Sequence, residues 1–279
     1  MILVEITAIL LFTTALIWAR RRNPSRVAEL MSGLVYGLIL EALDMAVFRT
    51  YHYGIGYALM AGPVPISIAL LWSLILASSM ALSDRLNLSL WKRPFADALF
   101  AVLIDLSIDA IAIRLGYWHW KIRPDQGWFG VPAGNLYGWM WVTFWFSMIT
   151  RWVRGARLQK KSSAWMQMFV PLPAYLGLFV CLLVMGRLAT AWSLSDPNQR
   201  LILFWILAAG FFCVAFIPFK GLTLTGPPIP SIFGMSRLLI HLYFVGALFV
   251  TGWGFRMPVL LAVALSVFAV EGFLVLRTR

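Results

Sequence analysis

The chain has 279 residues, of which 61% are hydrophobic and only 12% are charged. Water-soluble domains carry roughly 25% charged residues, so this composition excludes a protein with a water-soluble surface. The formal net charge of +12 is explained by the loops of a membrane protein and their contact with anionic membrane lipid, so no nucleic acid is expected as a partner.

Apolar runs long enough to cross a bilayer recur along the whole chain. A membrane-spanning helix needs roughly 20 apolar residues, because the hydrocarbon core is about 30 Å thick. The sequence therefore predicts an all-α, polytopic integral membrane bundle of about nine helices, with residues 1–279 forming a single domain. The predicted spans, of which the eighth is short, are 1–19, 28–48, 61–82, 94–115, 134–153, 165–190, 198–219, 237–253 and 257–276.

The distribution of basic residues predicts the orientation of the bundle, because short cytoplasmic loops collect Lys and Arg. With the N-terminus outside and the C-terminus inside, most basic residues fall on the cytoplasmic side. The inside set is Arg20, Arg21, Arg22, Arg26, Arg85, Lys92, Arg93, Arg151, Arg154, Arg157, Lys160, Lys161, Lys220, Arg237, Arg277 and Arg279. The smaller outside set is Arg49, Arg114, Lys121, Arg123, Arg187, Arg200 and Arg256.

Acidic residues in the second and fourth spans are the main exception to apolarity. Glu41 and Asp44 are three residues apart, and Asp105 and Asp109 are four apart, so each pair lies on one face of its helix. A carboxylate that faces lipid costs at least about 2.5 kcal/mol. We therefore expect both pairs to face the interior of the bundle and to line one cavity.

Two interpretations of these acids remain open. One is structural: Asp109 could pair with Arg114, and Asp44 with Arg49, as buried ion pairs. The other is functional, because an unpaired carboxyl in a low-dielectric site stays protonated and can act as a Brønsted acid. The functional interpretation is favoured because the acids outnumber the nearby bases. Counting helical turns back from residue 120 puts Asp109 about three turns below that residue.

Residues 116–139 are dense in aromatic side chains, glycine and proline. An aromatic belt at the membrane interface is the simpler explanation of such a segment. The density of rings, together with the amide of Asn135 and the turn at residues 130–132, favours a structured lid over the mouth of a cavity.

Sequence patterns for metal and nucleotide chemistry are missing. His52, His119 and His241 are far apart, and no HExxH or CxxC pattern occurs, so we expect no metal site. No phosphate-binding loop, dinucleotide fingerprint or nucleophile elbow occurs either. These patterns predict chemistry without a cofactor.

The stretch from Asp105 to Trp139 resembles the signature region of the CruF-like carotenoid biosynthesis proteins. In order, it has two aspartates four residues apart, a Trp-x-Trp, a Gly-Val-Pro, an asparagine and a Gly-Trp. The acidic second span and the run from Tyr51 to Trp72 are also similar, so the resemblance covers about residues 36–145. Ala110 and Leu136 depart from the pattern, which has proline and an aromatic residue there.

The resemblance implies a hydratase of the bacterial inner membrane that adds water across the terminal 1,2 double bond of an acyclic carotenoid end. The substrate would be of the lycopene or γ-carotene type, and other enzymes of the carotenoid pathway would be partners. The candidate catalytic residues are Asp105, Asp109, Glu41 and Asp44. The candidate substrate-binding residues are Tyr53, Trp72, Tyr117, Trp118, Trp120, Trp128, Phe129, Asn135 and Trp139.

Two alternatives come from other classes of protein. A membrane polyprenyl transferase of the UbiA type would carry a magnesium-binding acidic motif in each half, but the second half here has only Asp196 and Glu271. A non-catalytic carotenoid-binding or transport protein would have the same aromatic-walled cavity, and only product formation separates it from an enzyme.

Overall fold

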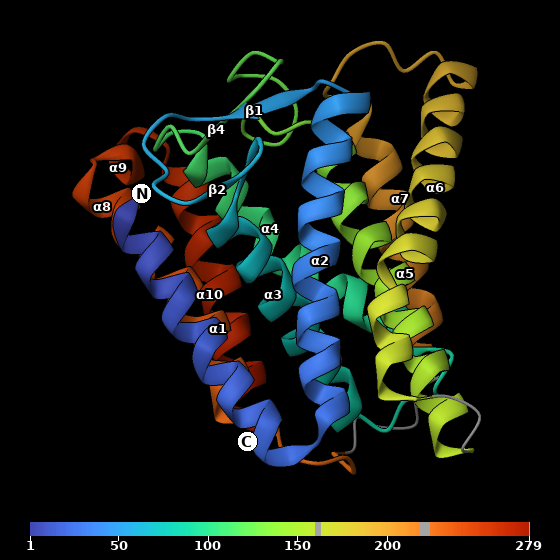
Figure 1. Cartoon of the computed structure of the whole chain (residues 1–279). Helices are drawn as coiled ribbons and strands as arrows, with labels where there is room; N and C mark the ends of the chain where they lie inside the picture. The colour runs from blue at the N-terminus through green and yellow to red at the C-terminus, as the bar shows by residue number, and fades with distance from the viewer. Residues whose placement is uncertain (160–162, 218–223, 279) are drawn as a thin grey trace.

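Helices make up most of residues 1–159, 163–217 and 224–278, which the computed structural model describes (Figure 1). Lys160, Lys161, Lys220 and Arg279 lie outside these residues. The elements are α1 (Ile2–Arg22), α2 (Pro24–Val47), α3 (Ile66–Arg85), α4 (Arg93–Ala112), α5 (Ala133–Leu158), a 3-10 helix η1 (Ala164–Phe169), α6 (Pro171–Ala191), α7 (Leu201–Phe216), α8 (Ser231–Val250), α9 (Trp253–Arg256) and α10 (Pro258–Thr278). Apart from the short α9, the described α-helices correspond to the nine predicted spans.

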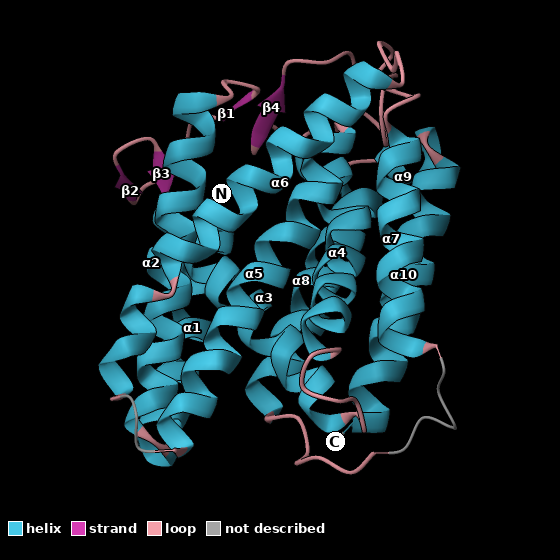
Figure 2. Ribbon diagram, turned by 90° about the vertical axis from the view of Figure 1, so that its right-hand side faces the viewer, coloured by secondary structure: helices cyan, strands magenta, loops and turns pink. Residues whose placement is uncertain are grey.

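The bundle is an all-α membrane protein, as the sequence predicts. In the described residues, six helical segments are long and apolar enough to cross a bilayer: α1, α2, α3, η1 with α6, α8 and α10. Helix α4 is of spanning length but carries Arg93 and three aspartates, and α7 has only 16 residues. These helices run alongside the six (Figure 2). The two termini lie toward opposite ends of the bundle, which agrees with an odd number of spans (Figure 1).

Two glycines let helix α2 approach helix α3 closely. A Cβ on Gly33 would lie 3.0 Å from the backbone of Ser73, and one on Gly37 would lie 3.0 Å from Trp72 Cβ. Small residues four apart let membrane helices pack backbone to backbone. Glu41 continues the same four-residue spacing, so this packing directs its side chain toward α3.

A small antiparallel sheet covers one end of the bundle. Strand β1 (Tyr51–Tyr53) pairs with β4 (Trp118–Trp120), so that Tyr51 lies opposite Trp120 and Tyr53 opposite Trp118. A second pair, β2 (Met60–Ala61) and β3 (Val64–Pro65), lies in the same connection as β1. We call the two connections, residues 48–65 and 113–132, the lid. The lid therefore has two parts. The sequence predicted a lid only at residues 116–139, of which residues 133–139 belong to helix α5.

The N-terminal helix anchors the first part of the lid. Glu5 on α1 is buried, and its carboxylate accepts hydrogen bonds from the backbone amides of Ala58 (3.0 Å) and Leu59 (2.9 Å). A carboxylate that accepts backbone amides holds a loop firmly, because bonds to a charged group are about twice as strong as neutral ones. The acidic residue near the start of the first span thus positions the lid.

At the end of the bundle away from the lid, ion pairs join four helices. Arg151 on α5 pairs with Asp97 on α4 at 2.9 Å, and also with Asp84 on α3. Arg154 pairs with Glu29 on α2 at 2.7 Å. Asp97 is therefore held in a structural ion pair.

The prediction for the eighth span was wrong in two respects. Helix α8 begins at Ser231 and has 20 residues, so it is not short. Arg237, predicted for a cytoplasmic loop, is fully buried within this helix and forms an ion pair with Glu271 on α10. The pairing removes the cost of an isolated charge in a low-dielectric interior, which allows arginine inside the span.

Candidate functional site

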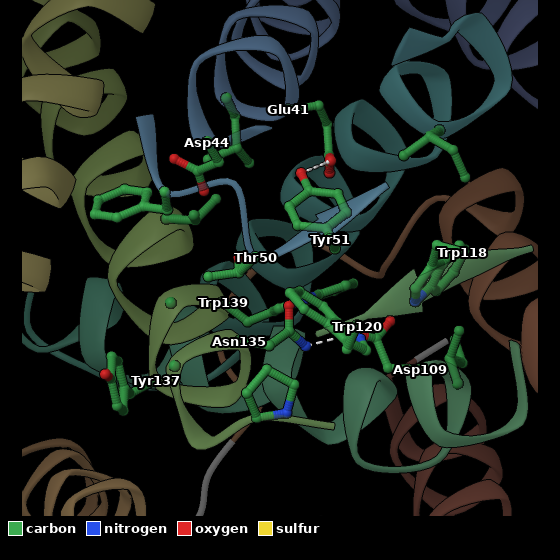
Figure 3. Close-up of a pocket in the computed structure, with 18 of the residues that line it drawn as sticks. Glu41, Asp44, Thr50, Tyr51, Asp109, Trp118, Trp120, Asn135, Tyr137 and Trp139 are labelled. Carbon is green, nitrogen blue, oxygen red and sulfur yellow. Dashed lines mark hydrogen bonds between the residues drawn. The ribbon is translucent and has the colours of Figure 1, made fainter. Parts of the chain in front are cut away.

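A cavity of about 410 Å³ lies beneath the lid, and three acidic side chains line it: Glu41, Asp44 and Asp109. Helices α2 to α6 and α8 contribute to its walls, together with strands β1 and β4. Figure 3 shows Glu41 and Asp109 on different walls, with aromatic side chains between them. The two predicted acidic stripes therefore reach one cavity.

Glu41 is surrounded by hydrogen-bond donors. Both phenols of strand β1 donate to its Oε2, Tyr53 at 2.6 Å and Tyr51 also, while Trp72 Nε1 donates to Oε1 at 2.7 Å. Burial and then the charge of Glu41 raise the pKa of Tyr51 and Tyr53 above the ordinary phenol value, so both remain donors. Three hydrogen-bond donors therefore face the two oxygens of this carboxyl group.

Asp105 and Asp109 share one donor. The side-chain amide of Asn135 donates to Oδ2 of Asp105 at 2.9 Å and to Oδ2 of Asp109. Asp109 lines the cavity, whereas Asp105 is fully buried behind it and is not among the described lining residues. Its Oδ1 has no hydrogen-bond partner within the described chain. The two aspartate carboxyls thus share one amide donor, whereas Glu41 alone has three donors.

The aspartate pair lies closer to the lid than the sequence indicated. Helix α4 ends at Ala112, so Asp109 is less than one turn from its end rather than three turns below the lid. Gly116, with φ of 73°, reverses the chain there, and the Tyr117 amide bonds back to the carbonyl of Ala112. Strand β4 consequently lies over the acids instead of extending the helix away from them.

The structural alternative fails for Asp44 and Asp109 among the described residues. Asp44 accepts a hydrogen bond from Tyr175 on α6 at 3.3 Å, while Arg49 donates to a backbone carbonyl. Arg114 likewise donates to backbone carbonyls, including that of residue 129 at 2.8 Å. Neither arginine is paired with the acid proposed for it, so these carboxyls are held by neutral partners.

Most of the predicted substrate-binding residues line the cavity. They are Tyr53, Trp72, Tyr117, Trp118, Trp120, Asn135 and Trp139. Trp128 and Phe129 are not among its described lining residues. Trp128 instead donates through Nε1 to the carbonyl of Leu106 at 2.7 Å, and Phe129 lies in a tight turn with φ of 50°. Both are therefore lid residues outside the described lining of the cavity.

The sequence interpretation missed Tyr51 and Tyr175 as partners of the acids. The role of Tyr51 could have been predicted from the sequence, because Tyr51 and Tyr53 are two residues apart and such residues share a face of a strand. The role of Tyr175 could not, since Tyr175 lies on a helix 131 residues away from Asp44 in the chain. No group of three or more His, Cys, Asp or Glu side chains that could hold a metal occurs in the residues described.

The fold and cavity define an integral membrane helical bundle with an acidic, aromatic-walled chamber beneath a lid. The family model of the carotenoid biosynthesis proteins matches residues 1–195, and the chain belongs to this family. That match includes α1 to α6, both parts of the lid and all three acids of the cavity. The comparisons with curated proteins and with solved structures find no match.

Proposed function

We propose that this protein hydrates an acyclic carotenoid end, adding water across the terminal 1,2 double bond. The observation that carries the proposal is the contrast between two kinds of carboxyl in one apolar cavity. Glu41 has three donors, whereas Asp105 and Asp109 share one. When two carboxyls have environments that favour different protonation states, one can act as the acid and the other as the base.

The chemistry needs one proton and one water. A carboxylic acid gives a proton to the less substituted carbon of the terminal double bond, which leaves a tertiary cation on its neighbour. Water then forms a bond to the cation and gives up a proton to a carboxylate, and the product is a tertiary alcohol. Return of this proton to the donor, directly or through water, restores the acid for the next cycle. No oxidant, reductant or metal takes part in this balance.

The aspartate pair suits the donor role. Two carboxyls this close share a proton, because both cannot ionise without strong repulsion. Asp109 lines the cavity and can reach a substrate, while Asp105 behind it holds or returns the proton. We therefore assign the donor to Asp109 with Asp105 as its partner.

Glu41 suits the opposite role. As an anion it stabilises the cation and can take a proton from the attacking water, with Asp44 beside it on α2. The faces of Trp72 and Trp139, whose ring centroids lie 4.2 Å apart, supply further stabilisation of positive charge. A cavity with mostly apolar walls also keeps bulk water from competing for the cation.

Co-expression with genes that make lycopene or γ-carotene tests this proposal. The expected result is a carotenoid heavier by one water and more polar in chromatography, and the Asp109→Asn variant should not produce it. An unchanged pigment profile, with the protein present in the membrane, would contradict hydratase activity and leave a carotenoid-binding protein as the better interpretation.

The transferase alternative loses support from the second half of the chain. Glu271 is buried in its ion pair with Arg237, and Asp196 accepts a hydrogen bond from the backbone amide of Asn198. Neither lines the cavity as the structure describes it. A second magnesium-binding acidic motif facing the first is therefore not supported.

A further inference from the structure

One arm of the cavity runs along helices α5 and α6. Gly138 on α5 and Leu178, Leu182 and Gly186 on α6 line it. The three α6 residues are four apart, so they form one face of the helix. In Figure 3, Tyr137 of the same stretch of α5 lies across the pocket from Trp118.

The two glycines of this arm leave open space. A Cβ built on Gly138 or Gly186 would meet no atom within 4 Å. Gly177 on the same helix behaves differently, since a Cβ there would lie 2.4 Å from the ring of Trp145. Close helix packing thus explains Gly177 but does not explain Gly138 or Gly186.

The arm opens on the lipid-facing side of the bundle. Gly186 lines the cavity and is also exposed, so the cavity reaches the surface at this residue. On the side of α6 toward Gly186 the exposed residues are apolar, with Leu172, Leu176 and Leu183 each at least half exposed. An apolar exposed face on a membrane helix contacts lipid, so an apolar chain can pass through this opening without entering water.

The length of a carotenoid requires such an opening. The arm extends about 12 Å from Leu178 to Gly186, at 1.5 Å per residue. A carotenoid is about as long as the hydrocarbon core is thick, roughly 30 Å. If one end lies at Asp109, most of the chain has to lie outside the cavity.

We propose that Gly138 and Gly186 form a portal through which the unreacted part of a long apolar substrate extends into the bilayer. The inference rests on the proposed function for the class of substrate. Because the glycines keep the portal open, they limit how bulky a substrate chain can be where it passes through the portal. A linear polyene passes, whereas a chain bearing a ring at that point does not.

A matched pair of variants tests the portal. Gly186→Trp places a large ring in the arm, whereas Gly210→Trp places the same ring in open space on α7, at an exposed glycine that does not line the described cavity. Each purified variant is measured for retention of an acyclic carotenoid and for its conversion. Retention by Gly186→Trp should fall roughly tenfold or more, and retention by Gly210→Trp should match the wild type.

Two further variants are included in the test. Gly138→Trp should lower retention as Gly186→Trp does, while Gly186→Ala, which adds one methyl group in open space, should lower it less than Gly186→Trp. If wild-type protein retains the pigment without hydrating it, the proposed reaction fails and the portal is still tested by retention. Equal retention by Gly186→Trp, Gly138→Trp and Gly210→Trp would overturn the portal.

Discussion

The hydroxyl of Tyr53 donates a hydrogen bond of 2.6 Å to the carboxylate of Glu41, so the lid is bonded directly to an acid of the cavity. Tyr53 is on β1 and Glu41 is on α2, 12 residues apart in the chain. Movement of the lid would therefore change the environment of Glu41. The position of the lid and the hydrogen bonding of this carboxyl are coupled through the two phenols of β1.

Removing this donor should slow the reaction. A hydrogen bond to a charged group contributes about 1.5 to 3 kcal/mol, so Tyr53→Phe or Tyr51→Phe should lower the rate roughly ten- to hundredfold. Tyr57→Phe is the matched control, because the Tyr57 hydroxyl donates to the carbonyl of Tyr117 and not to Glu41. Initial rates of product formation provide the measurement. Equal rates for all three variants would contradict a role for the Glu41 environment.

Removing the proton donor should nearly abolish the reaction. General acid catalysis contributes about 10² to 10⁴ in rate, so Asp109→Asn and Asp105→Asn should each lose activity on this scale. Asp97→Asn should retain it, because Asp97 pairs with Arg151 away from the cavity. If the variants at 105 and 109 stay active and Glu41→Gln does not, the donor is on α2 and the assignment is reversed.

The ion pair of Arg237 and Glu271 should be structural. Removing one partner of a buried pair costs about 3 to 5 kcal/mol, whereas replacing both with apolar residues is often neutral. Glu271→Gln should therefore lower the thermal unfolding temperature in detergent more than the double variant Arg237→Met with Glu271→Leu. A double variant less stable than the single one would show that the charges themselves hold α8 against α10.

Orientation in the membrane remains a prediction from basic residues, and cysteine labelling tests it. Cysteines introduced near Arg123 and Arg200 should react with a membrane-impermeant reagent added outside. Cysteines near Arg157 and Arg277 should react only after the membrane is made permeable. Labelling of positions 123 and 157 from the same side would contradict the nine-span topology.

The helices could be predicted from sequence because each obeys a local rule. A bilayer demands about 20 apolar residues per span, and that length is visible without any knowledge of neighbours. The sequence also predicted that Glu41 and Asp109 face one cavity, because exposing a carboxylate to lipid is costly. Both conclusions depend on the solvent rather than on particular contacts.

The remaining features depend on contacts between distant segments. The lid needs β1 to pair with β4, and nothing local in residues 51–53 reveals that partner. Arg237 resembled a loop residue because its partner Glu271 is 34 residues away. The depth of Asp109 was misjudged because Gly116, a single residue in a left-handed conformation, ends the helical path early.

The central claim is that water is added to the carotenoid by the protein's own carboxyls. Purified wild-type protein, an acyclic carotenoid and water labelled with heavy oxygen should be incubated with a metal chelator, beside the Asp109→Asn variant. We expect the wild type to form a product heavier by one labelled water, and the variant to form almost none. Unlabelled product, product only when magnesium is restored, or equal product from both proteins would contradict the claim.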